Sequence, residues 1–203
     1  MRNIEAMRHG LRAVALAGFI FISSVARGEV LFPIGGTPTN QGGIVAGNTF
    51  TAFGGQTLNS LGFIDLGNDG IAGGYSVGLW DTTTQALLAS TTVTPSSPLI
   101  NGFRYAPIPA TTIPNGTSFT IGALLPPTPT PDAWLTNTLL TLGVGFTGTG
   151  TGQFTTSGSL VFPGTLDSAP YAVANASAVV VPEPASIASI ALAALLLRRR
   201  RLT

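Results

Sequence analysis

The sequence predicts an all-β protein: a jelly-roll-like β-sandwich domain set between two targeting segments. The first observation is composition, because 26 Gly, 15 Pro and 27 Thr among 203 residues favour turns and strands over helices. The second is that short stretches of alternating apolar and polar residues recur between the glycines and prolines. The third is that no stretch between residues 29 and 178 keeps an apolar period of 3.6 residues over three helical turns.

The expected strands are short and separated by turns. The clearest is 75–80, where Tyr75, Val77 and Leu79 lie on one face and Ser76, Gly78 and Trp80 on the other. Residues 67–70 and 81–84 are typical of turns, and the proline-rich segment 126–131 is expected to be an extended loop. Many short strands of this kind indicate a sandwich or a barrel. The expected strands are 44–53, 58–65, 75–80, 87–93, 103–106, 118–125, 139–146, 159–162 and 171–174.

The charged residues exclude several classes of protein. Charged residues make up only 8% of the chain, which contains neither Cys nor Lys, and its single His is His9. There is thus no disulfide framework, cysteine-based zinc site, Walker-A lysine or Schiff base. Between residues 29 and 181, six acids face one base, Arg104, so the middle of the chain has a net charge of −5. Such a domain repels nucleic acid and anionic lipid.

Residues 1–26 have the pattern of a secretory signal peptide. A polar, basic start is followed by an uncharged, mostly apolar run at 13–25, and Ser24 and Ala26 supply the small residues of a cleavage site after Ala26. The alternative is a membrane anchor, but a span needs about 20 apolar residues. The pattern therefore predicts export through the secretion machinery.

The opposite end, residues 180–203, forms a second targeting segment. Pro182, Glu183 and Pro184 precede an uncharged apolar run at 185–197, which is expected to be a short transmembrane helix. Four arginines follow it and should stay on the cytoplasmic side, so everything before Pro182 lies outside. The alternative is an unprocessed tail anchor. The four arginines are Arg198, Arg199, Arg200 and Arg201.

These residues resemble the PEP-CTERM sorting signal of Gram-negative bacteria. The triplet, the short helix and the arginine cluster occur in the order typical of that signal. The resemblance implies recognition by exosortase, a membrane enzyme similar to a transpeptidase, and cleavage near the triplet. It also implies that the protein is anchored transiently in the inner membrane and then reaches the cell surface or an extracellular matrix.

The middle of the chain weakly resembles an uncharacterised bacterial β-sandwich domain of extracellular proteins. The resemblance lies in LGFIDLGNDGIAGGYSVGLWD, LLASTTV, FRYAPI and NGTSFTIGAL, between about residues 50 and 124. It implies a sugar-associated or matrix module, placed here at residues 29–178, without an assigned catalytic activity.

Few residues of this domain suggest chemistry. Asp65, Asn68 and Asp69 on a Gly-rich turn are candidate Ca²⁺ ligands, and the alternative is a turn closed by its own hydrogen bonds. Apart from this weak possibility no cofactor is expected. Trp134 is the candidate for stacking on a sugar ring. Arg104 is expected to form a salt bridge with Asp65, Asp69 or Asp81.

The glycine pattern at 143–148 matches a dinucleotide-binding motif, but no helix is expected after it, so a turn is predicted instead. With no His in the mature chain and only scattered carboxylates, catalysis is not expected. The sequence thus predicts an exported, non-enzymatic surface or matrix protein. The alternative is a carbohydrate-binding module that acts on an exopolysaccharide.

Overall fold

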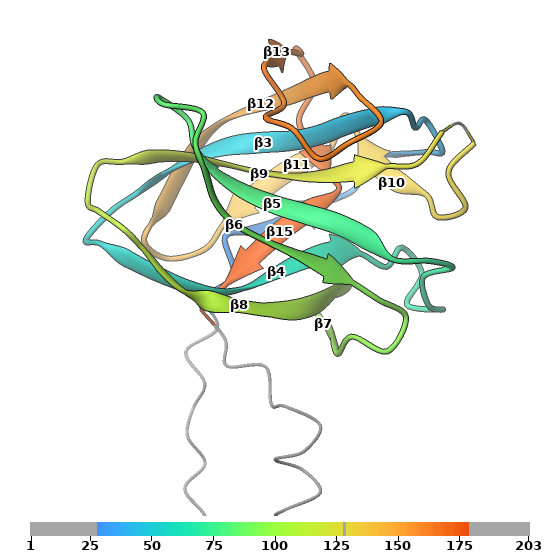
Figure 1. Cartoon of the computed structure of the whole chain (residues 1–203), viewed down its shortest axis with the longest axis horizontal. Helices are drawn as coiled ribbons and strands as arrows, with labels where there is room; N and C mark the ends of the chain where they lie inside the picture. Colours follow the sequence, from blue (N-terminus) through green and yellow to red (C-terminus); the bar gives the residue numbers. More distant parts are fainter. Residues whose placement is uncertain (1–27, 128, 179–203) are drawn as a thin grey trace, which may run out of the picture.

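The structure, a computed structural model, describes residues 28–127 and 129–178. These residues form strands and turns, and they include no helix (Figure 1). The described part of the protein is therefore all-β, as the sequence predicts. In these two ranges no helix is long and apolar enough to cross a membrane.

The larger of two main sheets has six antiparallel strands. Its order across the sheet is β13-β12-β3-β9-β5-β6, so strands far apart in the sequence lie side by side. The strands are β3 (Ile44–Ala52), β5 (Tyr75–Asp81), β6 (Leu87–Val93), β9 (Ser118–Leu125), β12 (Phe146–Thr156) and β13 (Thr165–Leu166).

The second main sheet has four strands in the order β15-β4-β8-β7. They are β4 (Gln56–Ile64), β7 (Leu99–Ile100), β8 (Phe103–Ile113) and β15 (Ala174–Ser177). Two small sheets complete the described domain. One pairs β1 (Leu31–Ile34) with β11 (Leu139–Leu142), and the other joins β14 (Tyr171–Ala172), β10 (Trp134–Thr136) and β2 (Thr37–Thr39).

The core lies between the two main sheets, as in a sandwich. Phe50 of β3 and Phe119 of β9 point inward from the larger sheet and are 1% and 0% exposed. From the smaller sheet, the ring of Phe63 stacks on that of Tyr75, with ring centroids 3.7 Å apart. Successive side chains of a strand alternate between its two faces. The residues that directly precede and follow each of these inward-facing aromatic residues in its strand therefore point to the outer faces of the sheets.

Several expected strands are confirmed, and two are wrong. The strands predicted at 87–93 and 118–125 match β6 and β9 to the residue. The predicted strand at 139–146 instead ends at Leu142, because a turn follows in which Gly145 has a φ of +89°. The predicted strand at 159–162 is not a strand. There Phe162 packs edge-on against the ring of Trp80, with ring centroids 6.3 Å apart.

The structure also contains strands that the sequence analysis did not anticipate. The longest is β12, whose Thr-Gly sequence pairs with β3 through a register shift between Gly148 and Gly152. This strand takes the place of the predicted glycine-rich turn at the end of the 143–148 motif. Since a strand follows the motif, the glycine pattern lacks the strand–turn–helix context that the dinucleotide motif requires. The other unanticipated strands are β1, β2, β7, β10 and β13, together with β15 beyond its first residue, Ala174.

Candidate functional site

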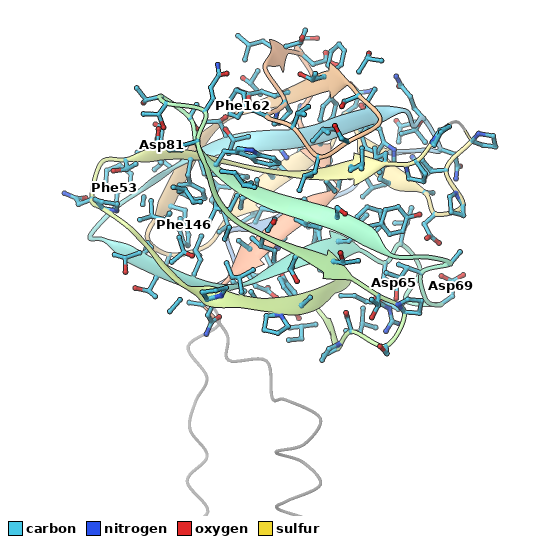
Figure 2. The ribbon with its side chains drawn as sticks, in the orientation of Figure 1. Phe53, Asp65, Asp69, Asp81, Phe146 and Phe162 are labelled. Atoms are coloured by element: carbon cyan, nitrogen blue, oxygen red, sulfur yellow. The ribbon has the colours of Figure 1, made fainter. Side chains whose placement is uncertain are left out.

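Carboxylates gather at one end of the sandwich, where β4 leads into β5. Asp65 and Asp69 lie on this connection, at the right of Figure 2. Together with Asp132 and Asn40 they line a cavity of about 220 Å³. Because three carboxylates share it, this cavity is the candidate functional site, and we call it the acidic cavity.

Asp65 is held in an ion pair with Arg104. Its Oδ2 lies 2.7 Å from Nε of Arg104, and the side chains are 0% and 16% exposed. Oδ1 of Asp65 accepts a hydrogen bond from the backbone N–H of Gly70 at 3.1 Å. Nη1 of Arg104 also donates to the carbonyl oxygens of Pro95 and Ser97, each at 3.0 Å. The predicted salt bridge of Arg104 is therefore confirmed, with Asp65 as the partner.

The turn after Asp65 carries the other two candidate calcium ligands. Asn68 has a φ of +60°, and its backbone N–H donates to the carbonyl oxygen of Asp65 at 3.0 Å. Both Asn68 and Asp69 are exposed, whereas both oxygens of the Asp65 carboxylate are already engaged. This geometry is that of a turn closed by its own hydrogen bonds. Within the described residues, no three side chains of His, Cys, Asp or Glu form a group suited to a metal ion.

Asp132 fixes the proline-rich loop to β5. Its Oδ2 accepts hydrogen bonds from the Tyr75 hydroxyl at 2.7 Å and from the backbone N–H of Ala72 at 2.8 Å. Burial, followed by the hydrogen bond to Asp132, raises the pKa of the Tyr75 hydroxyl well above its ordinary value. The sequence analysis did not anticipate this contact, because Asp132 and Tyr75 are 57 positions apart.

The chemistry open to the acidic cavity follows from these bonds. Acid–base hydrolysis by two carboxylates needs both groups facing the bond that is cleaved. Asp65 and Asp132 instead bind backbone N–H groups, Arg104 or Tyr75. The exposed carboxylate of the cavity is Asp69. The cavity is therefore suited to weak polar contacts.

A second, more open groove of about 460 Å³ lies beside the acidic cavity. It shares Ile64, Asp65 and Leu66 with the cavity and extends toward the connections before β2 and before β8. Most of its lining comes from Gly, Pro and Asn, so backbone groups are close to its surface. These residues are Pro33, Gly35, Gly36, Pro38, Gly67, Asn68, Asn101 and Gly102.

The prediction that Trp134 offers an exposed ring for sugar stacking is wrong. Its side chain is 2% exposed, and its Nε1 donates to the carbonyl oxygen of Gln41 at 2.9 Å. Its ring packs edge-on against Tyr171, with centroids 5.2 Å apart. The ring is thus part of the buried hydrophobic core and is closed off from the surface.

All the tryptophans and tyrosines of the chain, two and three in number, are buried. The most exposed of them is Tyr171, at 4%. Its hydroxyl donates to the carboxylate of Asp167, which lowers the pKa of Asp167. Burial raises the pKa of Tyr171 well above its ordinary value. No Trp or Tyr ring is therefore available on the surface for stacking on a sugar.

The outer face of the larger sheet instead carries linked hydroxyl groups. Thr120 is the centre of the group, since its Oγ1 lies 2.8 Å from that of Thr49 and 2.9 Å from that of Thr82. Beside them, Oγ1 of Thr51 lies 3.0 Å from Oγ of Ser118. The inward-facing Phe50 and Phe119 alternate with these residues, so the hydroxyls lie on the outer face. We call these five residues the hydroxyl face; the sequence analysis did not assemble them, because they come from three separate segments.

The two targeting segments lie outside the described residues. This applies to the cleavage residue Ala26, to the triplet Pro182, Glu183 and Pro184, and to the arginine cluster at 198–201. Comparison with known proteins yields neither a matching protein-family model nor a match among the curated proteins.

Proposed function

We propose that the protein is an exported, non-enzymatic component of the cell surface or of an extracellular matrix. In this proposal, the secretion machinery exports the chain and residues 1–26 are removed. Residues 180–203 then hold it transiently in the inner membrane until an exosortase-type enzyme cuts near the triplet Pro182, Glu183 and Pro184. This sorting pathway rests on the sequence pattern and on its resemblance to the PEP-CTERM signal.

The observation that carries the non-enzymatic, structural part of the proposal is how the polar groups of the domain are used. The carboxylates of Asp65 and Asp132 hold loops in place, and the hydroxyls of the hydroxyl face bond to one another. A matrix component needs a stable, uncharged and hydrated surface more than it needs a reactive cleft. The hydroxyl face contributes four partly exposed hydroxyl side chains to such a surface, around Thr120, which is 0% exposed.

The alternative function, binding of an exopolysaccharide, is supported by a different observation. The partly exposed hydroxyls around the buried Thr120 and an open, backbone-lined groove of about 460 Å³ offer hydrogen bonds to a sugar chain. With every Trp and Tyr buried, this binding would depend on hydrogen bonds without ring stacking, and we expect it to be weak. Ca²⁺ at Asn68 and Asp69 remains a secondary proposal, for which the engaged carboxylate of Asp65 leaves few ligands.

We also propose a jelly-roll-like connection of the strands. β3 pairs with β9 in the larger sheet while β4, which follows β3, pairs with β8 in the smaller one. The two pairs together form a ribbon that passes from one sheet to the other around the hairpin of β5 and β6. This wrapped ribbon supports the jelly-roll-like assignment.

The experiment that tests the sorting proposal compares two variants in a cell that carries the sorting enzyme. Replacing Pro182, Glu183 and Pro184 with Ala should leave an uncut, membrane-bound precursor. Replacing the arginines at 198–201 with Ser should let the chain slip through the membrane with its tail still attached. A matched control replaces Pro126, Pro127 and Pro131 with Ala, which alters prolines away from the tail. If both tail variants reach the surface with the same mature mass as the wild type, the proposal is wrong.

A further inference from the structure

The described chain begins and ends at the same place. The backbone N–H of Ala178 donates to the carbonyl oxygen of Gly28 at 3.2 Å, and Glu29 forms an antiparallel bridge with Ser177. The N–H of Val30 donates to the carbonyl oxygen of Ala176 at 2.9 Å. Figure 1 shows β15 running to this place, on the side of the molecule opposite β13.

Two exposed apolar side chains lie on turns that are hydrogen-bonded to this junction, one directly and the other through the first turn. The turn between β11 and β12 contacts it directly, because the N–H of Gly143 donates to the carbonyl oxygen of Val30 at 3.0 Å. Val144 follows in that turn with 97% of its side chain exposed. The turn between β3 and β4 is attached through the N–H of Phe53, which donates to the carbonyl oxygen of Gly145 at 2.8 Å, and Phe53 is 50% exposed. We call Phe53, Val144 and their two turns the apolar end.

The apolar end carries no charge although the domain is acidic. Residues 53–56 and 142–146 contain no charged side chain, and Glu29 beside them is 0% exposed. Asp65 and Asp69 lie at the opposite side of the view in Figure 2 from Phe53. Asp81 is closer, but it lies on β5, and β9 separates β5 from β3 in the sheet. The two turns that carry Phe53 and Val144 therefore bring no charged side chain of their own into contact with an apolar partner.

We propose that the apolar end rests on the surface of the lipid bilayer for as long as the tail remains attached. This inference rests on the proposed function, in which residues 185–197 are in the membrane. From Ala178 to Ala185 there are seven residue steps, which span at most about 25 Å when fully extended. The junction must therefore stay within about 25 Å of the bilayer. Val144 lies on the turn bonded to the junction, and Phe53 lies on the next turn. Apolar side chains at such a surface lose contact with water by entering the interface.

The chain contains no cysteine, so a spin label can be placed at one chosen position without further substitutions. The chain without residues 1–26, which is the tail-bearing form in the proposed function, is prepared as Val144→Cys and, as a matched control, as Leu166→Cys. Leu166 is 68% exposed and lies on β13, on the side away from the junction. Each labelled protein is reconstituted into vesicles of phosphatidylcholine, whose neutral headgroups exclude a purely electrostatic effect. Collision rates of the label with oxygen and with a water-soluble nickel complex then report its depth.

The label at Val144 should collide more often with oxygen and several-fold less often with the nickel complex than the label at Leu166. Adding Phe53→Ser to the Val144→Cys protein should move its values toward those of Leu166. If the protein floats with the vesicles but both labels are equally accessible to nickel, the lipid contact is overturned and the tail anchor stands. If the protein does not float with the vesicles, the tail anchor of the proposed function fails and the lipid contact fails with it.

Discussion

Replacing Arg104 with Met should destabilise the domain strongly. The substitution keeps much of the apolar stem but removes the cation that faces the fully buried carboxylate of Asp65 at 2.7 Å. It also removes the hydrogen bonds to the carbonyl oxygens of Pro95 and Ser97. Taking one partner from a buried ion pair costs about 3–5 kcal/mol, because the other charge is left uncompensated. We expect a loss of this size in the free energy of unfolding, a large share of the roughly 5–15 kcal/mol typical of a domain.

The loss can be measured by urea unfolding of residues 27–181, followed by tryptophan fluorescence. Trp80 and Trp134 are both 2% exposed, so their emission should change when the domain unfolds. A double-mutant cycle with Asp65→Asn isolates the pair, and we expect a coupling energy of about 1–3 kcal/mol between Arg104 and Asp65. The cycle is needed because Arg104→Met also removes bonds that do not involve Asp65.

The reasoning would be refuted if Arg104→Met lowered the free energy of unfolding by less than about 1 kcal/mol, the range of surface ion pairs. A coupling energy near zero would lead to the same conclusion. In that case the bond between Arg104 and Asp65 would be incidental, and another interaction would hold the β4–β5 connection at the acidic cavity.

Three further predictions follow from burial and close packing. Gly47→Ala should lower the free energy of unfolding in urea by about 1–3 kcal/mol, because the added Cβ would overlap the carbonyl oxygen of Ile121. The control Gly158→Ala meets open space and should stay within about 0.5 kcal/mol of wild type, so equal effects of the two substitutions would contradict the packing. Trp134→Ala should lower the free energy of unfolding by about 3–5 kcal/mol and leave adsorption to polysaccharide gels unchanged. Lost adsorption at unchanged stability would instead indicate that the Trp134 ring binds sugar. Absorbance at 295 nm should show no tyrosine ionising in the folded protein near pH 10, because burial raises the pKa values of all three tyrosines. The stability that the neutral tyrosines contribute is therefore present below pH 10 and lost at higher pH. Phenolate absorbance of the folded protein near pH 10 would contradict their burial.

The sequence predicts best those strands whose side chains alternate between two turns. β6 and β9 were predicted to the residue, because apolar and β-branched residues alternate along them and Gly or Pro lies nearby. β12 was missed since its Thr-Gly repeat has no apolar alternation, and its partner β3 is about 100 positions away. Residues 159–162 were wrongly predicted to form a strand. A short apolar run does not reveal whether it pairs with a neighbouring strand through backbone hydrogen bonds or only packs its side chains against another ring. Here Phe162 packs against Trp80 on the outer face.

For the site residues, too, local patterns could be predicted from the sequence, whereas partners distant in the sequence could not. The partner of Arg104 could be narrowed to a few acids, because Arg104 is the only base between residues 29 and 181. The burial of Trp134 could not be predicted, since its partners Tyr171 and Gln41 are 37 and 93 positions away. The adjacent Pro131 and Asp132 indicated a surface loop instead. The hydroxyl face and the apolar end likewise exist only after distant segments have been brought together by the sheets.

The central claim, export followed by removal of both ends, is tested most directly by the intact mass of the protein isolated from its native envelope. The account predicts the mass of a chain that begins after Ala26 and ends near the triplet Pro182, Glu183 and Pro184, without the arginines at 198–201. The mass of the complete 203-residue chain, or of a chain that still ends with the arginine cluster, would contradict it.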